Sequence, residues 1–461
     1  MKKTFLKLTA GLLAVVMVFA LVGCNNKGDV SDGGNTSSGG KKVLRFLSNV
    51  QDREHTEGLV EQMQLDKWLE QNPDFQFDYE FVPNANIQEK EAQYTATDNL
   101  PDVYKEWGGS LNFDNRVRNK MLVPIWDSPE QANEEGYDYP DGVLSKMQIS
   151  DGSDPAVYSA AVNFDFFVWF YNGEIFAKEG WSEPTNWAEL IALLDDMTAK
   201  GYVPASFSGK DPYQSGALVE EILQKVSGDN DLAKKIIEGD APTFSENADA
   251  KAAFTAAKEL VDHNVSGGSS WLAQDYAGAR GLFVNGEIPL YYFGSWEYMM
   301  IADDQLTDSF KENLDFFLTP LPEGAKGDMG MFQGYTGCGF AVASKSAYKD
   351  DAIGLIKFYF KKENFCKDGW TMKVFVPAQN FGEFANEDDA RLQKKVLEVM
   401  ETRTTVLENG AKLRGYSNEW NALVDPLFLD FFAGSISVDD MLTQFDDYAA
   451  QARADAEAAA A

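Results

Sequence analysis

The fold is decided by the stretch Phe75-Gln76-Phe77-Asp78-Tyr79-Glu80-Phe81, in which aromatic and polar side chains alternate. A period of two predicts a β-strand with one buried face. Residues 56–72, just before it, place apolar residues at helical spacing, and Pro73 ends that helix. A short apolar strand, Val43-Leu44-Arg45-Phe46-Leu47, comes first. Because a strand, a helix and a strand follow one another, we expect an α/β fold with a mostly parallel sheet covered by helices.

The same alternation continues beyond this opening. Asn186 stands three residues before Glu189, the spacing of a capping box, and predicts that a helix starts there. Apolar periodicity predicts further helices at residues 245–263 and 352–360, and central strands at residues 164–171 and 288–293. After Lys345 we expect an almost wholly helical chain. At this length, the chain is suited to two large lobes rather than one core.

The N-terminus carries a different signal. Two lysines precede an apolar run over residues 8–22 that is too short to span a membrane comfortably, which predicts a secretion signal at residues 1–23. The run ends in Leu21-Val22-Gly23-Cys24, which resembles the lipobox of bacterial lipoproteins and implies that Cys24 carries the lipid. The alternative is an ordinary cleaved signal followed by a chance cysteine. Residues 24–40 are rich in glycine and serine and predict a flexible tether behind the anchor.

Charge and composition exclude several functions. The chain has 461 residues and a formal net charge of −33, so it would repel the phosphates of nucleic acid, which is excluded as a partner. The two histidines, His55 and His263, form no metal-binding pattern, and we expect neither a metal nor another cofactor. Beyond Cys24 there are two cysteines, Cys338 and Cys366, which could form a disulfide or remain free thiols.

Several short motifs together resemble the carbohydrate-binding group of ABC-transporter solute-binding proteins that is related to maltose-binding protein. Each motif alone is weak, but their order and spacing along nearly the whole mature chain are specific to that family. The motifs are Leu100-Pro101-Asp102-Val103-Tyr104, Trp169-Phe170-Tyr171-Asn172, Pro184-Thr185-Asn186-Trp187, Phe283-Val284-Asn285-Gly286-Glu287, Gly294-Ser295-Trp296, Pro320-Leu321-Pro322 and Gly337-Cys338-Gly339-Phe340-Ala341-Val342.

The resemblance implies a periplasmic-binding-protein-like fold (type II), with two discontinuous lobes that close over a solute. The chain should cross between them near residues 161–167, 289–294 and 341–345. The N-terminal lobe would comprise residues 41–163 plus 290–342, and the C-terminal lobe residues 164–289 plus 343–461. The implied function is to capture a mono- or oligosaccharide and deliver it to the permease of an ABC importer, without catalysis. A monomer anchored by lipid outside the membrane of a Gram-positive bacterium would fit.

A sugar site needs flat aromatic rings for stacking and planar polar groups for hydroxyls. Trp107 is a candidate stacking platform and Glu106 a hydroxyl acceptor, since both follow a predicted strand whose carboxyl end faces the ligand in such folds. Trp107 could equally be a core residue. Asp165 interrupts an aromatic run at the first crossing, where it either accepts from a ligand hydroxyl or caps backbone amides.

The remaining candidates lie later in the chain. Ser295 and Trp296 sit at a predicted strand-to-helix corner, where Trp296 either lines the site or packs the corner. Tyr335 lies between glycines and could stack on a sugar or belong to an ordinary turn. Trp271 either packs on its lobe or reaches the ligand. Arg414 could bind adjacent hydroxyls or form a surface salt bridge. Weaker candidates after the first strand are Asn49, Asp52 and Glu54.

Two rival functions remain open from the residues. A secreted glycoside hydrolase would also use aromatic rings and paired carboxylates, and an acidic chain always offers such a pair. The same fold could instead bind a polyamine or another cationic solute among carboxylates and aromatic rings.

Overall fold

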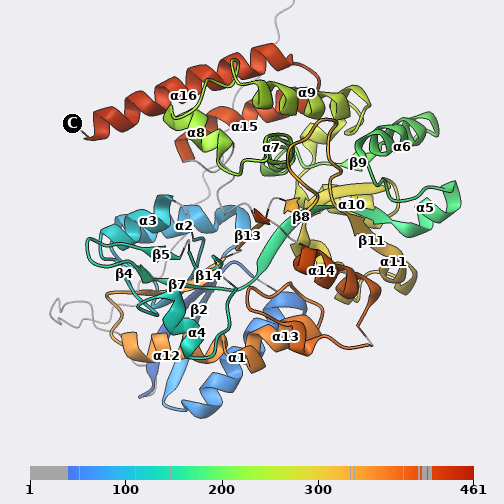
Figure 1. Cartoon of the computed structure of the whole chain (residues 1–461). Coiled ribbons are helices and arrows are strands. Elements are labelled where there is room, and N and C mark those ends of the chain that lie inside the picture. The colour runs from blue at the N-terminus through green and yellow to red at the C-terminus, as the bar shows by residue number, and fades with distance from the viewer. Residues whose placement is uncertain are drawn as a thin grey trace, which may run out of the picture.

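The computed structural model describes residues 40–50, 52–108, 111–140, 142–145, 147–332, 334–336, 338–387, 389–402, 405–406, 413 and 418–460. The predicted signal and tether, and with them Cys24, lie outside these residues. Helices and strands mix throughout, which confirms the expected α/β fold. Figure 1 shows two groups of elements with β8 running from one to the other.

The first sheet contains the strand–helix–strand opening that the sequence predicts. Its order is β2-β1-β3-β14-β4, with β7 also paired to β14. The strands are β1 (Lys42–Ser48), β2 (Phe75–Phe81), β3 (Val103–Glu106), β4 (Leu122–Val123), β7 (Ser159–Ala161) and β14 (Gly339–Ala343). β1, β2 and β3 are parallel, as expected, whereas β14 is antiparallel to β3, β4 and β7.

The second sheet is built around one long strand and has the order β11-β8-β10-β9, with β13 also paired to β8. Its members are β8 (Phe164–Asn172), β9 (Ala205–Ser206), β10 (Leu290–Gly294), β11 (Leu314–Phe317) and β13 (Gly334–Thr336). β8 is antiparallel to all three of its neighbours, so the expectation of mostly parallel strands is wrong here. Two further pairs of short strands are β5 (Gln148–Ile149) with β6 (Ala156–Val157), and β12 (Met331–Phe332) with β15 (Thr405–Val406).

Helices cover both sheets. With the first sheet lie α1 (Thr56–Gln71), α2 (Asn84–Ala96), α3 (Leu111–Arg118), α4 (Pro129–Glu134), α12 (Lys349–Tyr359) and α13 (Lys367–Thr371). With the second sheet lie α5 (Gly173–Glu179), α6 (Trp187–Ala199), α7 (Tyr213–Ser227), α8 (Leu232–Glu238), α9 (Ala248–Asp262), α10 (Tyr276–Val284), α11 (Asp308–Asn313), α14 (Arg391–Thr402), α15 (Asn418–Phe432) and α16 (Val438–Ala460). Short irregular helices are η1 (Ser270–Ala273), η2 (Ser295–Ala302), η3 (Lys362–Cys366) and η4 (Gly382–Phe384). We call each sheet with its helices the first lobe and the second lobe.

Strand pairing corrects the expected division of the chain between the lobes. β10 and β11, expected in the first lobe, pair with β8 of the second. α12 and α13, expected in the second lobe, pack on α1 of the first. The chain passes between the sheets from β7 to β8 and returns from β13 to β14, whereas residues 289–294 are no crossing. Strand order does not follow from local pattern, because pairing joins segments far apart in sequence.

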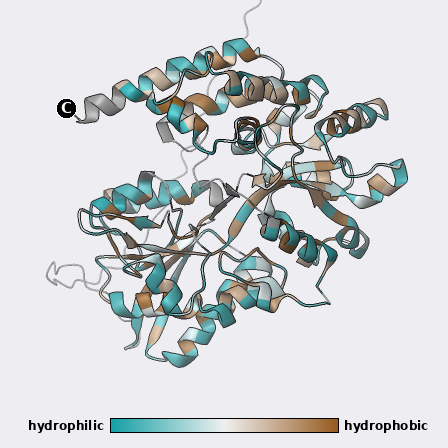
Figure 2. Ribbon diagram, viewed as in Figure 1, coloured by the Kyte–Doolittle hydropathy of each residue, from teal (hydrophilic) through white to brown (hydrophobic). Residues whose placement is uncertain are grey.

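The core explains why β8 holds the molecule together. All nine of its residues are buried, and successive side chains point to opposite faces. Phe166, Val168 and Phe170 join the core that continues into the first lobe, whereas Phe167 and Trp169 join the core of the second. Figure 2 shows hydrophobic colouring along β8 and mostly hydrophilic colouring on the outer turns of the helices.

Two findings concern the wider molecule. Of the helices in the described part of the chain, none is both long and apolar enough to traverse a bilayer. Cys338 and Cys366 are free thiols, so the alternative of two unpaired cysteines matches this structure.

Candidate functional site

The candidate site lies where β8 enters the second lobe, and it begins with Asp165. Asn163 Nδ2 donates to Asp165 Oδ2 over 2.5 Å, and Ser295 Oγ donates to Asp165 Oδ1 over 3.3 Å. The backbone N–H of Phe166 in turn donates to Ser295 Oγ over 3.1 Å. Asp165 therefore binds side chains from the crossing and from η2, and the alternative that it caps backbone amides directly is not what is seen.

Burial makes Asp165 an unusual acid. Its side chain is 3% exposed. The pKa of Asp165 is raised from 3.8 to about 8 as the net of several effects: desolvation raises it most, the hydrogen bonds from Ser295 and Asn163 lower it, and the charge of Glu57 raises it. Asp165 therefore carries a proton at neutral pH and can itself donate a hydrogen bond.

Trp296 lies next to this pair and packs on β8 and β10 of the second lobe. Its ring meets Phe167 edge-on at 5.6 Å and Phe293 edge-on at 5.2 Å, and it borders both large cores while staying half-buried. A Cβ atom on Gly294 would come within 1.9 Å of the ring, so glycine is needed at that position. The two readings of Trp296 thus combine, because it packs the corner with part of its ring left accessible.

Tyr335 is brought to the same place by strand pairing. β13 runs antiparallel to β8, with Tyr335 opposite Asp165. The backbone places residues 165, 295, 296 and 335 together where β8 enters the second lobe, which we call the junction.

Glu106 and Trp107, at the end of β3, take different roles from those expected. Glu106 is buried and accepts from Trp107 N–H at 3.0 Å and from Tyr104 O–H at 3.1 Å, and it forms an ion pair with Arg116. Its two oxygens are therefore engaged inside the first lobe, and its role as a hydroxyl acceptor stays a prediction. Trp107 stays half-buried at the carboxyl end of the strand, with its backbone held by Glu106.

The same inner cluster contains a second buried acid. Glu91 is paired with Arg116 at 3.4 Å. Burial, reinforced by the charge of Glu106, raises the pKa of Glu91 to about 9, because one guanidinium cannot neutralise two carboxylates in a desolvated space.

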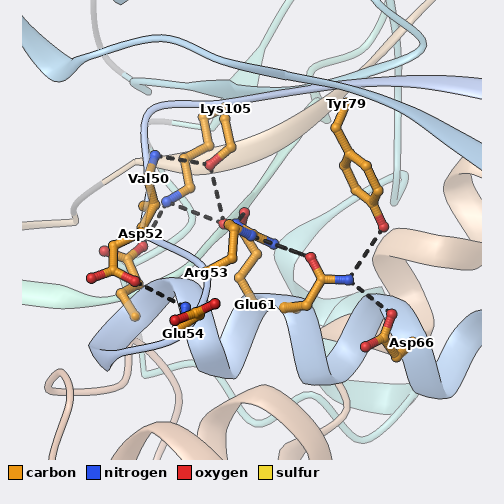
Figure 3. A network of polar contacts seen from close by, with 11 residues as sticks. Val50, Asp52, Arg53, Glu54, Glu61, Asp66, Tyr79 and Lys105 are labelled. Atoms are coloured by element: carbon orange, nitrogen blue, oxygen red, sulfur yellow. Dashed lines mark hydrogen bonds and ion pairs between the residues drawn. The ribbon is translucent and has the colours of Figure 1, made fainter.

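Sequence reasoning missed a buried network of ion pairs in the first lobe, which is centred on Lys105. Lys105 is fully buried, and its Nζ lies 2.6 Å from Glu57 Oε1 and 3.4 Å from Glu61 Oε2. Figure 3 shows this network, in which Glu61 also pairs with Arg53 and accepts from Ser48 Oγ at 3.3 Å. Desolvation lowers the pKa of Lys105, but Cys338, Glu57 and Glu61 raise it by more, so Lys105 stays charged.

Glu57 is the member of this network that remains reachable. Its side chain is 30% exposed, and it stands in the first turn of α1, where the helix dipole favours a negative charge. Glu57 also acts electrostatically on Asp165 from the other lobe. A lysine inside the buried strand 103–106 was the available signal, because a buried lysine must have an acidic partner.

The other predicted residues lie elsewhere. Trp271 is 4% exposed and packs on Phe207 at 5.9 Å in the core of the second lobe, which matches the alternative that it packs on its lobe. Arg414 lies outside the described residues. Asp52, one of the weaker candidates, is exposed near the start of α1 and is hydrogen-bonded to His55. Among the residues that the structure describes, no group of three or more His, Cys, Asp or Glu is placed to hold a metal ion.

Known proteins resemble this chain in sequence over limited stretches. A probable sugar-binding periplasmic protein of Brucella suis biovar 1 (strain 1330) is 31% identical over 142 residues, 30% of this chain and 32% of the relative. One of the same description from Rhizobium meliloti (strain 1021) is 29% identical over 171 residues, 36% of this chain and 39% of the relative. The chain thus covers between 32% and 39% of the length of these two curated relatives.

Solved structures resemble it over most of its length. A protein from work on xylan utilization by the thermophilic bacterium Caldanaerobius polysaccharolyticus has a TM-score of 0.77 at 18% identity, covering 88% of this chain and 100% of the other. A chitin oligosaccharide binding protein has a TM-score of 0.76 at 18% identity, covering 90% and 100%. At these identities the likeness establishes the two-lobed fold.

The family model described as bacterial extracellular solute-binding protein matches residues 54–364, more than half of the chain. This match begins after β1 and includes α1 and β2 of the opening, the passages from β7 to β8 and from β13 to β14, and the junction around Asp165. The chain therefore belongs to the bacterial extracellular solute-binding protein family.

Proposed function

We propose that this protein is the lipid-anchored receptor of an ABC importer, which binds a neutral mono- or oligosaccharide at the junction between its lobes and presents it to a membrane permease. The observation that carries the proposal is the grouping of Asp165, Ser295 and Trp296 where β8 enters the second lobe, within electrostatic range of Glu57 from the first lobe. Carboxyl and hydroxyl groups suit sugar hydroxyls, and the indole ring suits the apolar face of a pyranose. Trp107 and Tyr335 would add further aromatic surface.

The charge state of the junction favours a neutral ligand over a cation. Asp165 is protonated at neutral pH and offers no negative charge. Glu57 is neutralised by the ammonium of Lys105 at 2.6 Å. A polyamine, the main alternative ligand, would meet little uncompensated negative charge from these two acids.

The ligand class can be tested by thermal unfolding of the whole mature chain in the presence of glucose, galactose, N-acetylglucosamine, xylobiose, chitobiose, raffinose or spermidine. A ligand that binds only the folded state raises the unfolding midpoint. We expect at least one sugar to raise it and spermidine to have no effect. A higher unfolding midpoint with spermidine alone would indicate a cationic ligand instead of a sugar. Release of shorter sugars during the incubation would indicate a hydrolase.

The place of binding can be tested with aromatic variants. We expect Trp296→Ala to weaken binding of the best sugar by at least about tenfold, since stacking on an aromatic ring and its desolvation contribute more than about 1.4 kcal/mol. Tyr348→Ala is the matched control, because Tyr348 is also half-buried but packs on Phe75 at the opposite end of the first sheet. Equal losses in the two variants, measured by titration calorimetry, would argue against the junction.

The anchor can be tested separately through Cys24. We expect Cys24→Ser to release the protein from cells into the medium, because the thiol that would carry the lipid is gone. Mass spectrometry of the parent should find a lipid on an N-terminal Cys24. A parent protein that is equally free in the medium would contradict the anchor while leaving sugar binding untouched.

A further inference from the structure

A cavity of about 420 Å³ opens on the second lobe, away from the junction. It lies at the far end of β8, where Tyr171 and Gly173 lead into α5, and it is closed on the other side by the end of α11 and the start of α14. Asp165 stands at the opposite end of the same strand. The cavity is within the size range of small-molecule sites in proteins.

Aromatic rings form the inner wall of this cavity. Tyr171 and Phe176 are both buried, with ring centroids 4.3 Å apart, and Trp181 meets Phe176 edge-on at 5.7 Å. Trp181 is half-buried and its Nε1 donates to Asp196 over 2.6 Å, so the ring is held in place. Trp181 is the ring that leaves accessible apolar surface, and because Tyr171 and Phe176 are buried behind it, a ligand can contact it at low entropic cost.

The rim carries planar polar groups that are held by partners below them. Arg391 forms an ion pair with the buried Asp315 and donates from Nη2 to Leu314 O over 3.2 Å, yet its side chain is 55% exposed. Glu183 accepts from Tyr171 O–H at 2.8 Å and from Lys395 at 2.6 Å. The amide of Asn313 completes the rim. A guanidinium, a carboxylate and an amide are the groups that bind neighbouring hydroxyls.

The charges of the rim nearly cancel, which indicates the kind of ligand. Glu183 is paired with Lys395, and Asp315 with Arg391. Glu312, exposed at the mouth, adds one acid. A phosphate or another anion would meet this extra negative charge, and a strong cation would meet two basic groups. A neutral polyhydroxylated ligand with an apolar face fits both wall and rim.

We propose that this cavity is a second saccharide site, outside the junction, that takes one or two neutral sugar units. It shares no residue with the junction, so it goes beyond the proposed function and does not depend on it. Its exposed rim means that binding is weaker than at a site enclosed between lobes. Such a site would hold a neighbouring part of a longer glycan near the receptor.

The test follows the amide NMR signals of the whole mature chain during titration with the sugar panel named above, up to millimolar concentration. We expect saturable shifts at Gly173, Ser182 and Asn313. These shifts should persist in Trp296→Ala, which disables the junction. They should disappear in Ala177→Trp, because Ala177 lines the cavity and an indole there would fill it. Ala188→Trp is the matched control, since Ala188 is exposed on α6 and does not line the cavity.

The three possible patterns of shifts distinguish a second site from its absence. Shifts that persist in Trp296→Ala and Ala188→Trp but vanish in Ala177→Trp support the second site. Absence of shifts at the cavity with every sugar, or shifts that survive in Ala177→Trp, overturns it. If the cavity responds but the junction does not, the second site stands and the proposed function fails; the reverse pattern leaves the proposed function intact.

Discussion

At the scale of single residues, Asp165 shows how a fold changes the chemistry of a side chain. In the unfolded chain its pKa is near 3.8, and burial raises it to about 8 in the folded protein. Sequence reasoning could single out Asp165, because a carboxylate within an aromatic run must be paired or solvated. It could not predict the partners Asn163 and Ser295, since Ser295 lies 130 residues away in sequence.

A pH dependence follows from that pKa. Between about pH 4 and about pH 8 the unfolded chain has lost the Asp165 proton while the folded chain keeps it, so stability should fall as the pH rises. The size is about 1.4 kcal/mol for each unit by which the two pKa values differ. The side chain of Asp165→Asn cannot titrate. The free energy of unfolding of this variant, minus that of the parent, should therefore increase as the pH rises from about 4 to about 8. Denaturant unfolding across the range measures this; a constant difference between the two proteins would contradict the raised pKa.

The buried Lys105 gives a second prediction at this scale. Lys105→Met should reduce the free energy of unfolding by about 3–5 kcal/mol, because Glu61 is left buried with its charge only partly compensated. Adding Glu61→Gln should restore part of the loss, since the remaining charge is removed. Denaturant unfolding of the single and double variants checks this. A double variant that is less stable than Lys105→Met would show that the charge of Glu61 is not the cause.

At the scale of elements, apolar periodicity and capping residues predicted where individual helices and strands begin and end. β2 has the predicted bounds, α1 ends one residue early, and α6 begins directly after Asn186. β8 and β10 were also recognised as strands, but their sheet was not, because strand pairing joins segments more than a hundred positions apart. The ion pair of Glu106 with Arg116 joins β3 to α3 within the first lobe, and it could not be predicted because it depends on how the helix packs on the strand.

The capping box of α6 offers a test at this scale. Asn186 accepts from Glu189 N–H at 3.0 Å, and Glu189 accepts in return from Thr185 N–H at 2.7 Å, which confirms the predicted helix start. Asn186→Ala should lower the free energy of unfolding by about 1 kcal/mol. Asn186→Asp, which keeps an acceptor oxygen, should lose less. Thermal unfolding compares them; equal losses would mean that the side-chain oxygen does not matter.

At the scale of the whole molecule, two lobes meet around a group of side chains drawn from both. The sequence named Asp165, Ser295, Trp296 and Tyr335 one by one, and the second sheet brings their backbone together, since Asp165 lies in β8, Tyr335 in β13, and Ser295 and Trp296 directly follow β10. Glu57 and Lys105 join them from the first lobe and were missed, because their role depends on how the lobes face each other. Since ligand bound between lobes links them, the account requires that the lobes draw together on binding.

The most direct test of sugar capture between the lobes is small-angle X-ray scattering of the whole mature chain with and without a saturating amount of the best sugar. We expect a smaller radius of gyration in the presence of the sugar, and a reduced change for Trp296→Ala at the same sugar concentration. A sugar that binds, as shown by calorimetry on the same sample, but leaves the radius of gyration of the parent unchanged would contradict capture between the lobes.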